Sequence, residues 1–120
     1  MLRHPQNLFG KRLRSARERI GIPQDKLGIA IGLDEGCASA RISRYETGVH
    51  EPALVIATKL AQALKVPTAY FYCQRDSVAD LLLAMASLSE AEIALLKKAM
   101  SRIVRKRETT ARPRPTSTDT

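Results

Sequence analysis

Large aromatic side chains are scarce in this sequence of 120 residues, which has no Trp and only 4% Phe and Tyr together. Proteins that bind single-stranded nucleic acid stack successive bases on such rings. The scarcity therefore counts against that class of protein.

Long apolar runs are also absent. No run approaches the roughly 18 residues that a membrane span requires, and the start, MLRHPQNLFGKR, lacks the apolar region of a signal peptide. We expect a cytoplasmic protein with no membrane partner.

Cysteine is equally scarce, with Cys37 and Cys73 as the only two. Two Cys without paired spacing predict neither a disulfide framework nor a Cys-based zinc site, and His4 and His50 do not complete a set of ligands. We therefore expect no metal and no cofactor. Cys37 has two readings: a redox-sensing thiol near a helix start, or, as we favour, a small packing residue.

Acidic residues are outnumbered, because 12 Asp and Glu stand against 20 Lys and Arg, for a formal net charge of +8. Such a balance favours a polyanionic partner, with nucleic acid first and an acidic membrane surface second. The cations gather in residues 1–20 and 93–107, six in each range. Each single Lys or Arg can equally belong to a solvated helix face.

The spacing of apolar residues predicts an all-α fold and no strand. Helical patterns cover about residues 7–20, 23–31, 35–47, 53–64 and 68–72. Asn7 is a suitable N-cap for the first helix and Gly21 a suitable end. Gly32 closes the second helix, and Gly28 within it would let a crossing helix come very close.

Residues 76–107 predict two further helices with an apolar stripe to bury. Asp76 can cap the first, and Ser89 and Glu92 form a capping box at the start of the second. The stripe supplies candidate dimer residues: Leu82, Met85, Leu96, Met100 and Ile103. Their alternative role is to pack within the chain onto the fifth helix. Residues 108–120 are poor in apolar side chains and are expected to be a disordered tail.

Two short helices joined by a turn, with cations on the second, have the form of a helix-turn-helix. The sequence resembles the lambda-repressor and Cro-like helix-turn-helix family, also called the XRE family, over residues 7–72. Four fragments in order carry the resemblance: PQDKLGIAIGL, ISRYETG, EPALVIATKLAQALKV and FY. Their combination is specific, although each alone is weak. The resemblance implies a five-helix, lambda-repressor-like DNA-binding domain over residues 7–73.

The resemblance also implies the roles of several residues. Gln24, at the start of the second helix, matches a Gln that clamps a phosphate. Glu46 matches an acid that pairs with an Arg of the first helix, here Arg17, and we expect this pair to be structural. The loop after the third helix matches one whose main-chain N–H groups meet phosphate oxygens: Thr47, Gly48 and Val49.

Base reading is expected from the outward face of the third helix. Ile42 and Tyr45 are three residues apart and should point inward. The residues left to face the major groove are Ser39, Ala40, Ser43 and Arg44, with Arg41 to the side and better placed for phosphate. Arg44 is the strongest candidate, because a guanidinium can bind guanine O6 and N7 together. Its alternative role is a phosphate contact.

The segment LDEGCASAR, after the second helix, is longer than its counterpart in the family. Because Asp34 is a good N-cap, we predict that the third helix gains a turn and starts at Glu35, which gives a recognition helix of about 35–47. The alternative is a longer loop with a helix start near Ser39, which Gly36 favours.

We therefore expect a sequence-specific regulator of transcription that binds double-stranded DNA, a prokaryotic or phage repressor associated with the nucleoid. It should act as a homodimer that places two recognition helices in successive major grooves. The second hypothesis is a protein-binding module of the same fold, such as an antitoxin or an adaptor. An enzyme comes third, because no nucleophile–base pair, metal cluster or phosphate loop is evident.

Overall fold

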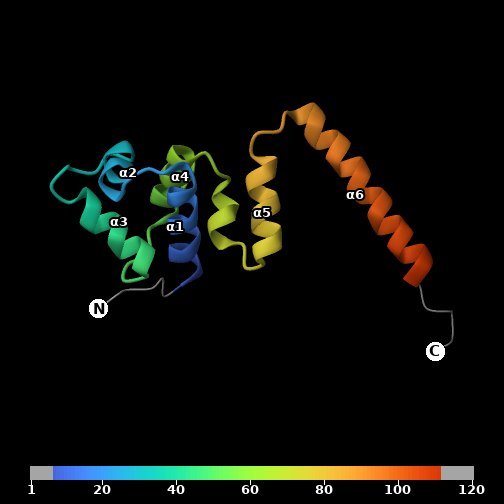
Figure 1. The fold of residues 1–120 in the computed structure, drawn as a ribbon, viewed down its shortest axis with the longest axis horizontal. Coiled ribbons are helices and arrows are strands. Elements are labelled where there is room, and N and C mark those ends of the chain that lie inside the picture. Colours follow the sequence, from blue (N-terminus) through green and yellow to red (C-terminus); the bar gives the residue numbers. More distant parts are fainter. Residues whose placement is uncertain (1–6, 112–120) are drawn as a thin grey trace. The chain divides into compact units, whose positions relative to one another are not determined.

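Helices form the framework of residues 7–111, the part of the chain that the computed structural model describes (Figure 1). They are α1 (Leu8–Ile20), α2 (Gln24–Ala30), α3 (Ala38–Thr47), α4 (Leu54–Leu64), the 3-10 helix η1 (Thr68–Tyr72), α5 (Asp76–Met85) and α6 (Glu90–Ala111). These residues include no strand, so the predicted all-α fold class is confirmed. None of the helices is both long and apolar enough to cross a bilayer.

Both ends of α1 form as the sequence predicts. The Asn7 side chain is the N-cap and accepts a hydrogen bond from the Gly10 N–H at 2.8 Å, which satisfies an amide that the helix start leaves free. Gly21 follows the helix at φ 72°, in the left-handed region that glycine enters without steric cost. The helix between these ends buries one face, which includes Phe9 and Leu13.

One apolar cluster holds α1 to α4 and η1 together. Each of these five elements contributes a fully buried side chain: Leu13, Leu27, Ile42, Leu60 and Phe71. Burial of such a side chain stabilises a fold by about 1.5–3 kcal/mol. The cluster therefore fixes α2 and α3 on the body of the domain.

α2 and α3 cross at Gly28. A Cβ at Gly28 would lie 2.6 Å from the Cβ of Ala38, so no side chain fits there, and the predicted close approach of a helix is confirmed. Gly32 ends α2 at φ 96°, and the next amide, that of Leu33, donates to the Gly28 carbonyl at 2.9 Å. The short helix therefore has a well-defined end.

The third helix begins later than predicted. α3 starts at Ala38 and not at Glu35, so the prediction of a recognition helix of about 35–47 is wrong. The preceding residues form a turn, in which the Cys37 N–H donates to the Asp34 carbonyl at 3.0 Å. The Cys37 thiol donates to the same carbonyl at 3.6 Å. The alternative of a longer loop before the helix is the one that the structure shows.

α5 packs against the preceding domain. Ala79 of α5 is fully buried, and the Asp76 carboxylate pairs with Arg12 of α1 at 2.9 Å and with Lys11 at 3.3 Å. Arg75 occupies the N-cap position of α5. The prediction of Asp76 as the cap is therefore wrong, because its carboxylate binds cations of α1 instead.

The chain divides into two compact units, residues 1–86 and 87–120. The predicted pair of C-terminal helices, 76–107, is split by this division, since α5 belongs to the first unit and α6 to the second. Leu82 of α5 packs against the core of the first unit. For this residue, packing within the chain is the alternative that the structure shows.

α6 begins at the predicted capping box. The Ser89 N–H donates to the Glu92 carboxylate at 2.9 Å, and the Glu92 N–H donates to the Ser89 hydroxyl at 3.1 Å. The helix continues to Ala111. Residues 108–111 are therefore helical, which contradicts the prediction of a disordered tail from 108 onward, and 112–120 lie outside the described residues.

Candidate nucleic-acid interface

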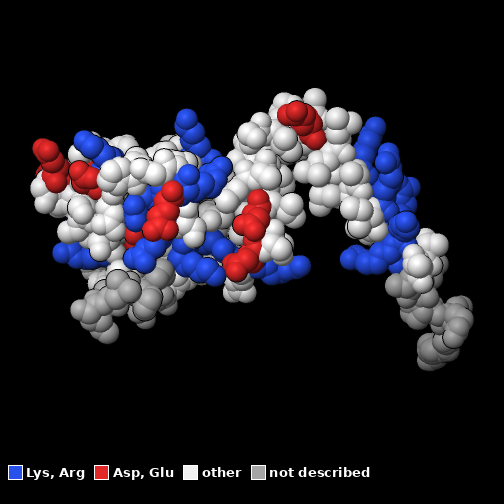
Figure 2. All heavy atoms as spheres, viewed as in Figure 1, with Lys and Arg blue, Asp and Glu red and all other residues white. Residues whose placement is uncertain are grey.

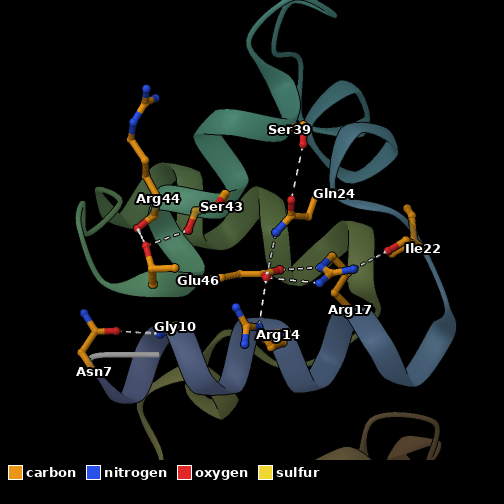
Figure 3. Close-up of polar contacts among 11 residues, drawn as sticks. Asn7, Gly10, Arg14, Arg17, Ile22, Gln24, Ser39, Ser43, Arg44 and Glu46 are labelled. Carbon is orange, nitrogen blue, oxygen red and sulfur yellow. Dashed lines mark hydrogen bonds and ion pairs between the residues drawn. The ribbon is translucent and has the colours of Figure 1, made fainter. Parts of the chain in front are cut away.

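A carboxylate with no solvent exposure lies where α1, α2 and α3 meet. Glu46 is 0% exposed, and Arg17 donates to both of its oxygens, through Nε and, at 3.2 Å, through Nη2. Arg14 donates at 3.3 Å and the Gln24 amide at 3.1 Å. Figure 3 shows these three side chains converging on Glu46. The buried charge is thus compensated, whereas an unpaired one would cost on the order of 3–5 kcal/mol.

Arg17 joins this carboxylate to the segment that leads into α2. The hydrogen bond from Arg17 to Glu46 raises the pKa of the guanidinium above its usual value, against the opposing effect of burial. Its Nη1 also donates to the Ile22 carbonyl at 3.1 Å. The expected Arg17–Glu46 pair is therefore part of a network that sets the position of α3 on α1.

Sequence reasoning missed Arg14 as a member of this network, and it missed the contacts that Gln24 makes with Glu46 and with Ser39. Arg14 lies three residues before Arg17, so both project from the same face of α1, and this spacing was the available signal. The Ser39 hydroxyl lies 3.4 Å from Oε1 of Gln24, a contact between α3 and α2 that no sequence pattern indicates. Gln24 consequently lies between Ser39 and Glu46, as Figure 3 shows.

α3 has one inward and one outward face. Ile42 is 0% and Tyr45 6% exposed, so both point inward as expected. The residues predicted to contact bases lie around the other face, with Ser43 half-buried and with Ser39, Ala40 and Arg44 exposed. In Figure 3 the Arg44 side chain extends away from the Glu46 network.

The side chains predicted to contact phosphate differ in solvent exposure and in the hydrogen bonds that they already make. Gln24 is half-buried and already donates to Glu46. Its amide carries a second N–H, which leaves one donor for a ligand. Arg41 is exposed, and its interaction with Tyr45 raises the pKa of the Arg41 guanidinium.

The loop after α3 offers fewer main-chain donors than predicted. The Thr47 side chain is buried, and its hydroxyl donates to the Ser43 carbonyl at 3.0 Å. The Gly48 N–H donates to the Tyr45 carbonyl at 3.3 Å. Val49 is 51% exposed, and no described backbone carbonyl accepts its N–H. Of these three residues, Val49 therefore has an amide N–H without a described main-chain acceptor.

The predicted dimer residues do not form one surface within a single unit. On α5, Leu82 and Met85 are half-buried; on α6, Leu96 is half-buried, while Met100 and Ile103 are 53% and 65% exposed. Because the two helices belong to different units, the apolar side chains of α6 form a stripe of their own.

The comparisons with known proteins agree with this geometry. A sequence-family model described as Helix-turn-helix matches residues 13–71. Among solved structures, the crystal structure of transcriptional regulator BswR is similar, with 39% sequence identity and a TM-score of 0.70, over 84% of this chain and 96% of that chain. No curated protein matches the chain. Residues 13–71 therefore have the lambda-repressor-like fold, and the chain belongs to the XRE family of helix-turn-helix proteins.

Proposed function

We propose that the chain is a sequence-specific regulator of transcription that binds double-stranded DNA and acts as a repressor in the cytoplasm. The outward face of α3 carries this proposal. Ile42 and Tyr45 hold the inward face in the core, and the exposed Arg44 has no ion-pair partner among the described residues. The membership of the chain in the XRE family and its similarity to transcriptional regulator BswR support the same function.

In this proposal, α3 lies in the major groove and reads bases with its outward residues. Arg44 makes a bidentate contact with guanine, worth about 1–3 kcal/mol of discrimination. The shorter side chains complete the contact surface: Ser39, Ala40 and Ser43. Phosphate contacts come from Gln24, Arg41 and the Val49 amide, because the Thr47 hydroxyl and the Gly48 N–H already donate within the chain.

A dimer follows from the size of this surface. A single module of this size buries about 600–1,000 Å² on DNA, which is less than most specific complexes bury. A homodimer would place two copies of α3 in major grooves about 34 Å apart. The apolar stripe of α6, with Leu96, Met100 and Ile103, is the surface that we propose to join the two copies.

Selection of bound sequences from a random duplex pool tests the function directly. We expect a symmetric or nearly symmetric site, and binding that weakens steeply as salt rises. Binding that lacks both sequence preference and salt dependence would favour a protein-binding module of the same fold.

Two substitutions separate base reading from phosphate binding. Arg44→Ala should relax the preference at one position of each half-site and cost about 1–3 kcal/mol for the selected duplex. Gln24→Ala should weaken all duplexes alike. Because Gln24 also donates to Glu46, thermal unfolding of both variants shows whether the fold is intact. A uniform loss from Arg44→Ala and a relaxed preference from Gln24→Ala would reverse the two roles.

A further inference from the structure

One side of α6 carries a line of cations. Lys98, Arg102 and Arg105 follow one another at steps of four and three residues, so they share a face of the helix, and Lys97 lies beside them. We call these four residues the basic stripe. Figure 2 shows Lys and Arg side chains gathered along α6.

The basic stripe has no acidic partner in the part of the chain that the structure describes. All four side chains are exposed, and no described carboxylate lies within salt-bridge distance of them. Small side chains between the cations leave a shallow groove, lined by Ala94, Lys97, Lys98, Ser101, Arg102 and Arg105. Four neighbouring cations without an acid repel one another, and a polyanion that lies along them relieves that repulsion.

The stripe is separate from the apolar face of the same helix. Ile93, Leu96, Met100 and Ile103 recur at steps of three, four and three residues, and the stripe occupies other positions of the helical repeat. A second copy that covers the apolar face therefore leaves the basic stripe accessible.

We propose that the basic stripe binds the phosphate backbone of duplex DNA outside the base pairs that α3 reads. This inference rests on the proposed function. With a rise of 1.5 Å per residue, the stripe from Lys97 to Arg105 is about 12 Å long. One DNA strand presents about one phosphate per 3.4 Å of helix axis, so roughly four phosphates face that length. Arg102 and Arg105 can each bind a phosphate through two N–H groups.

An anionic membrane surface is the other polyanion that a basic amphipathic helix can bind. Helices of that kind carry Trp, Phe or Leu on the apolar face, and α6 has Leu96 on that face but no aromatic residue. The chain also belongs to a helix-turn-helix family. Both observations favour DNA as the occupant.

The test uses the full chain with three stripe cations replaced: Lys98→Gln, Arg102→Gln and Arg105→Gln. Gln is a good helix former, so α6 should keep its helical content in circular dichroism. With the duplex selected by the wild-type chain, the slope of log affinity against log salt should become shallower by about 2.7 per chain, or about 0.9 per lost phosphate contact. Between about 50 and 200 mM salt, the wild-type chain should then lose roughly 40-fold more affinity than the variant for each bound copy, or roughly 1,800-fold more for a bound dimer. The preferred base sequence should stay the same.

A matched control removes three exposed cations that lie outside α6: Lys59→Gln, Lys65→Gln and Arg75→Gln. It should keep the wild-type slope. If the stripe variant also keeps that slope while Arg44→Ala still relaxes base preference, the regulator function stands and the inference about α6 is overturned. Vesicles of phosphatidylglycerol and phosphatidylcholine provide a second readout, since a loss of vesicle binding with an unchanged DNA slope would assign the stripe to a membrane. A wild-type chain that binds no duplex would overturn the proposed function itself.

Discussion

At Gly10, the backbone of α1 lies directly against the end of α3. A Cβ at this position would be 2.2 Å from the Glu46 carbonyl oxygen and 2.9 Å from that of Tyr45. Both neighbours are backbone atoms, which cannot rotate away as a side chain can. Close contact between α1 and α3 is also what lets Arg14 and Arg17 reach the Glu46 carboxylate. A single glycine thus permits the packing on which the buried charge network depends.

Gly10→Ala should therefore destabilise the protein, because α3 would have to move away from α1. Overpacking of this kind costs about 1–3 kcal/mol. Gly36→Ala is the matched control, since its Cβ would meet nothing within 4 Å and its φ is not positive; it should be neutral or stabilise by up to about 1 kcal/mol. Urea unfolding of both variants measures the difference. Equal stability of the two variants would show that α1 and α3 accommodate a Cβ at position 10 without cost.

Among the elements, three helix ends with local signals form as predicted, whereas the start of α3 and the cap of α5 do not. Three of the helix ends depend on contacts between residues that are close in sequence, and each forms as expected: those at Asn7, Gly21 and the Ser89–Glu92 box. The start of α3 was mispredicted, because Asp34 has the chemistry of an N-cap but the helix starts where Ala38 fits against Gly28. That fit is a contact between distant residues, which a single sequence does not contain.

The same distinction applies to the candidate site. The inward positions of Ile42 and Tyr45 followed from helical periodicity, and the Arg17–Glu46 pair from family resemblance. The Ser39–Gln24 contact and the Gly48 hydrogen bond depend on how the helices and the loop pack. Each contact uses a hydrogen-bond donor, the Ser39 hydroxyl or the Gly48 N–H, that would otherwise be available to DNA. The sequence does not indicate this reduction in available donors.

The attachment of α5 to α1 predicts a pH dependence of stability. Hydrogen bonds from Arg12 and then Lys11 lower the pKa of Asp76 below its ordinary value of 3.8. Near pH 3.8 the unfolded chain therefore binds more protons at this carboxyl than the folded chain does. The stabilising contribution is complete above the ordinary pKa and is lost as pH falls through the lowered folded pKa.

Asp76→Asn should therefore lower the thermal midpoint at neutral pH, and its difference from the wild-type chain should shrink as the pH falls below 3.8. The effect should be small because the carboxylate is exposed and screened by solvent. Asp80→Asn, on the same helix, is the control for the loss of a carboxylate, since Asp80 forms no ion pair with a described residue. If the thermal midpoints of the wild-type chain and Asp76→Asn differ by the same amount from neutral pH to below pH 3.8, the ion pair is not the cause of the difference.

At the scale of the whole molecule, the two units carry different surfaces. The first unit holds the outward face of α3 and has one apolar core, although single apolar side chains such as Leu54, Val55 and Leu81 remain exposed on it. In the second unit, α6 exposes Leu95, Met100, Ile103 and Val104 by 40% or more. A helix with this much exposed apolar surface is stabilised when a partner covers it. Because the function proposed above places two recognition helices in successive major grooves, a second copy of the chain is the partner that we propose.

Ile103→Glu should therefore convert the dimer to a monomer while leaving the first unit folded. Each buried aliphatic side chain contributes about 1.5–3 kcal/mol. A symmetric dimer loses two of them, or about 3–6 kcal/mol, so dimerisation should weaken by roughly hundredfold to ten-thousandfold, before any cost of burying the carboxylate. Ser101→Glu puts the same charge on the same helix, at an exposed position beside the basic stripe, and should remain dimeric. Light scattering at matched concentrations distinguishes the two variants. If Ile103→Glu remains a dimer, the copies must associate through another surface. Contacts between the first units, and not between the two α6 helices, would then set the distance between the two copies of α3.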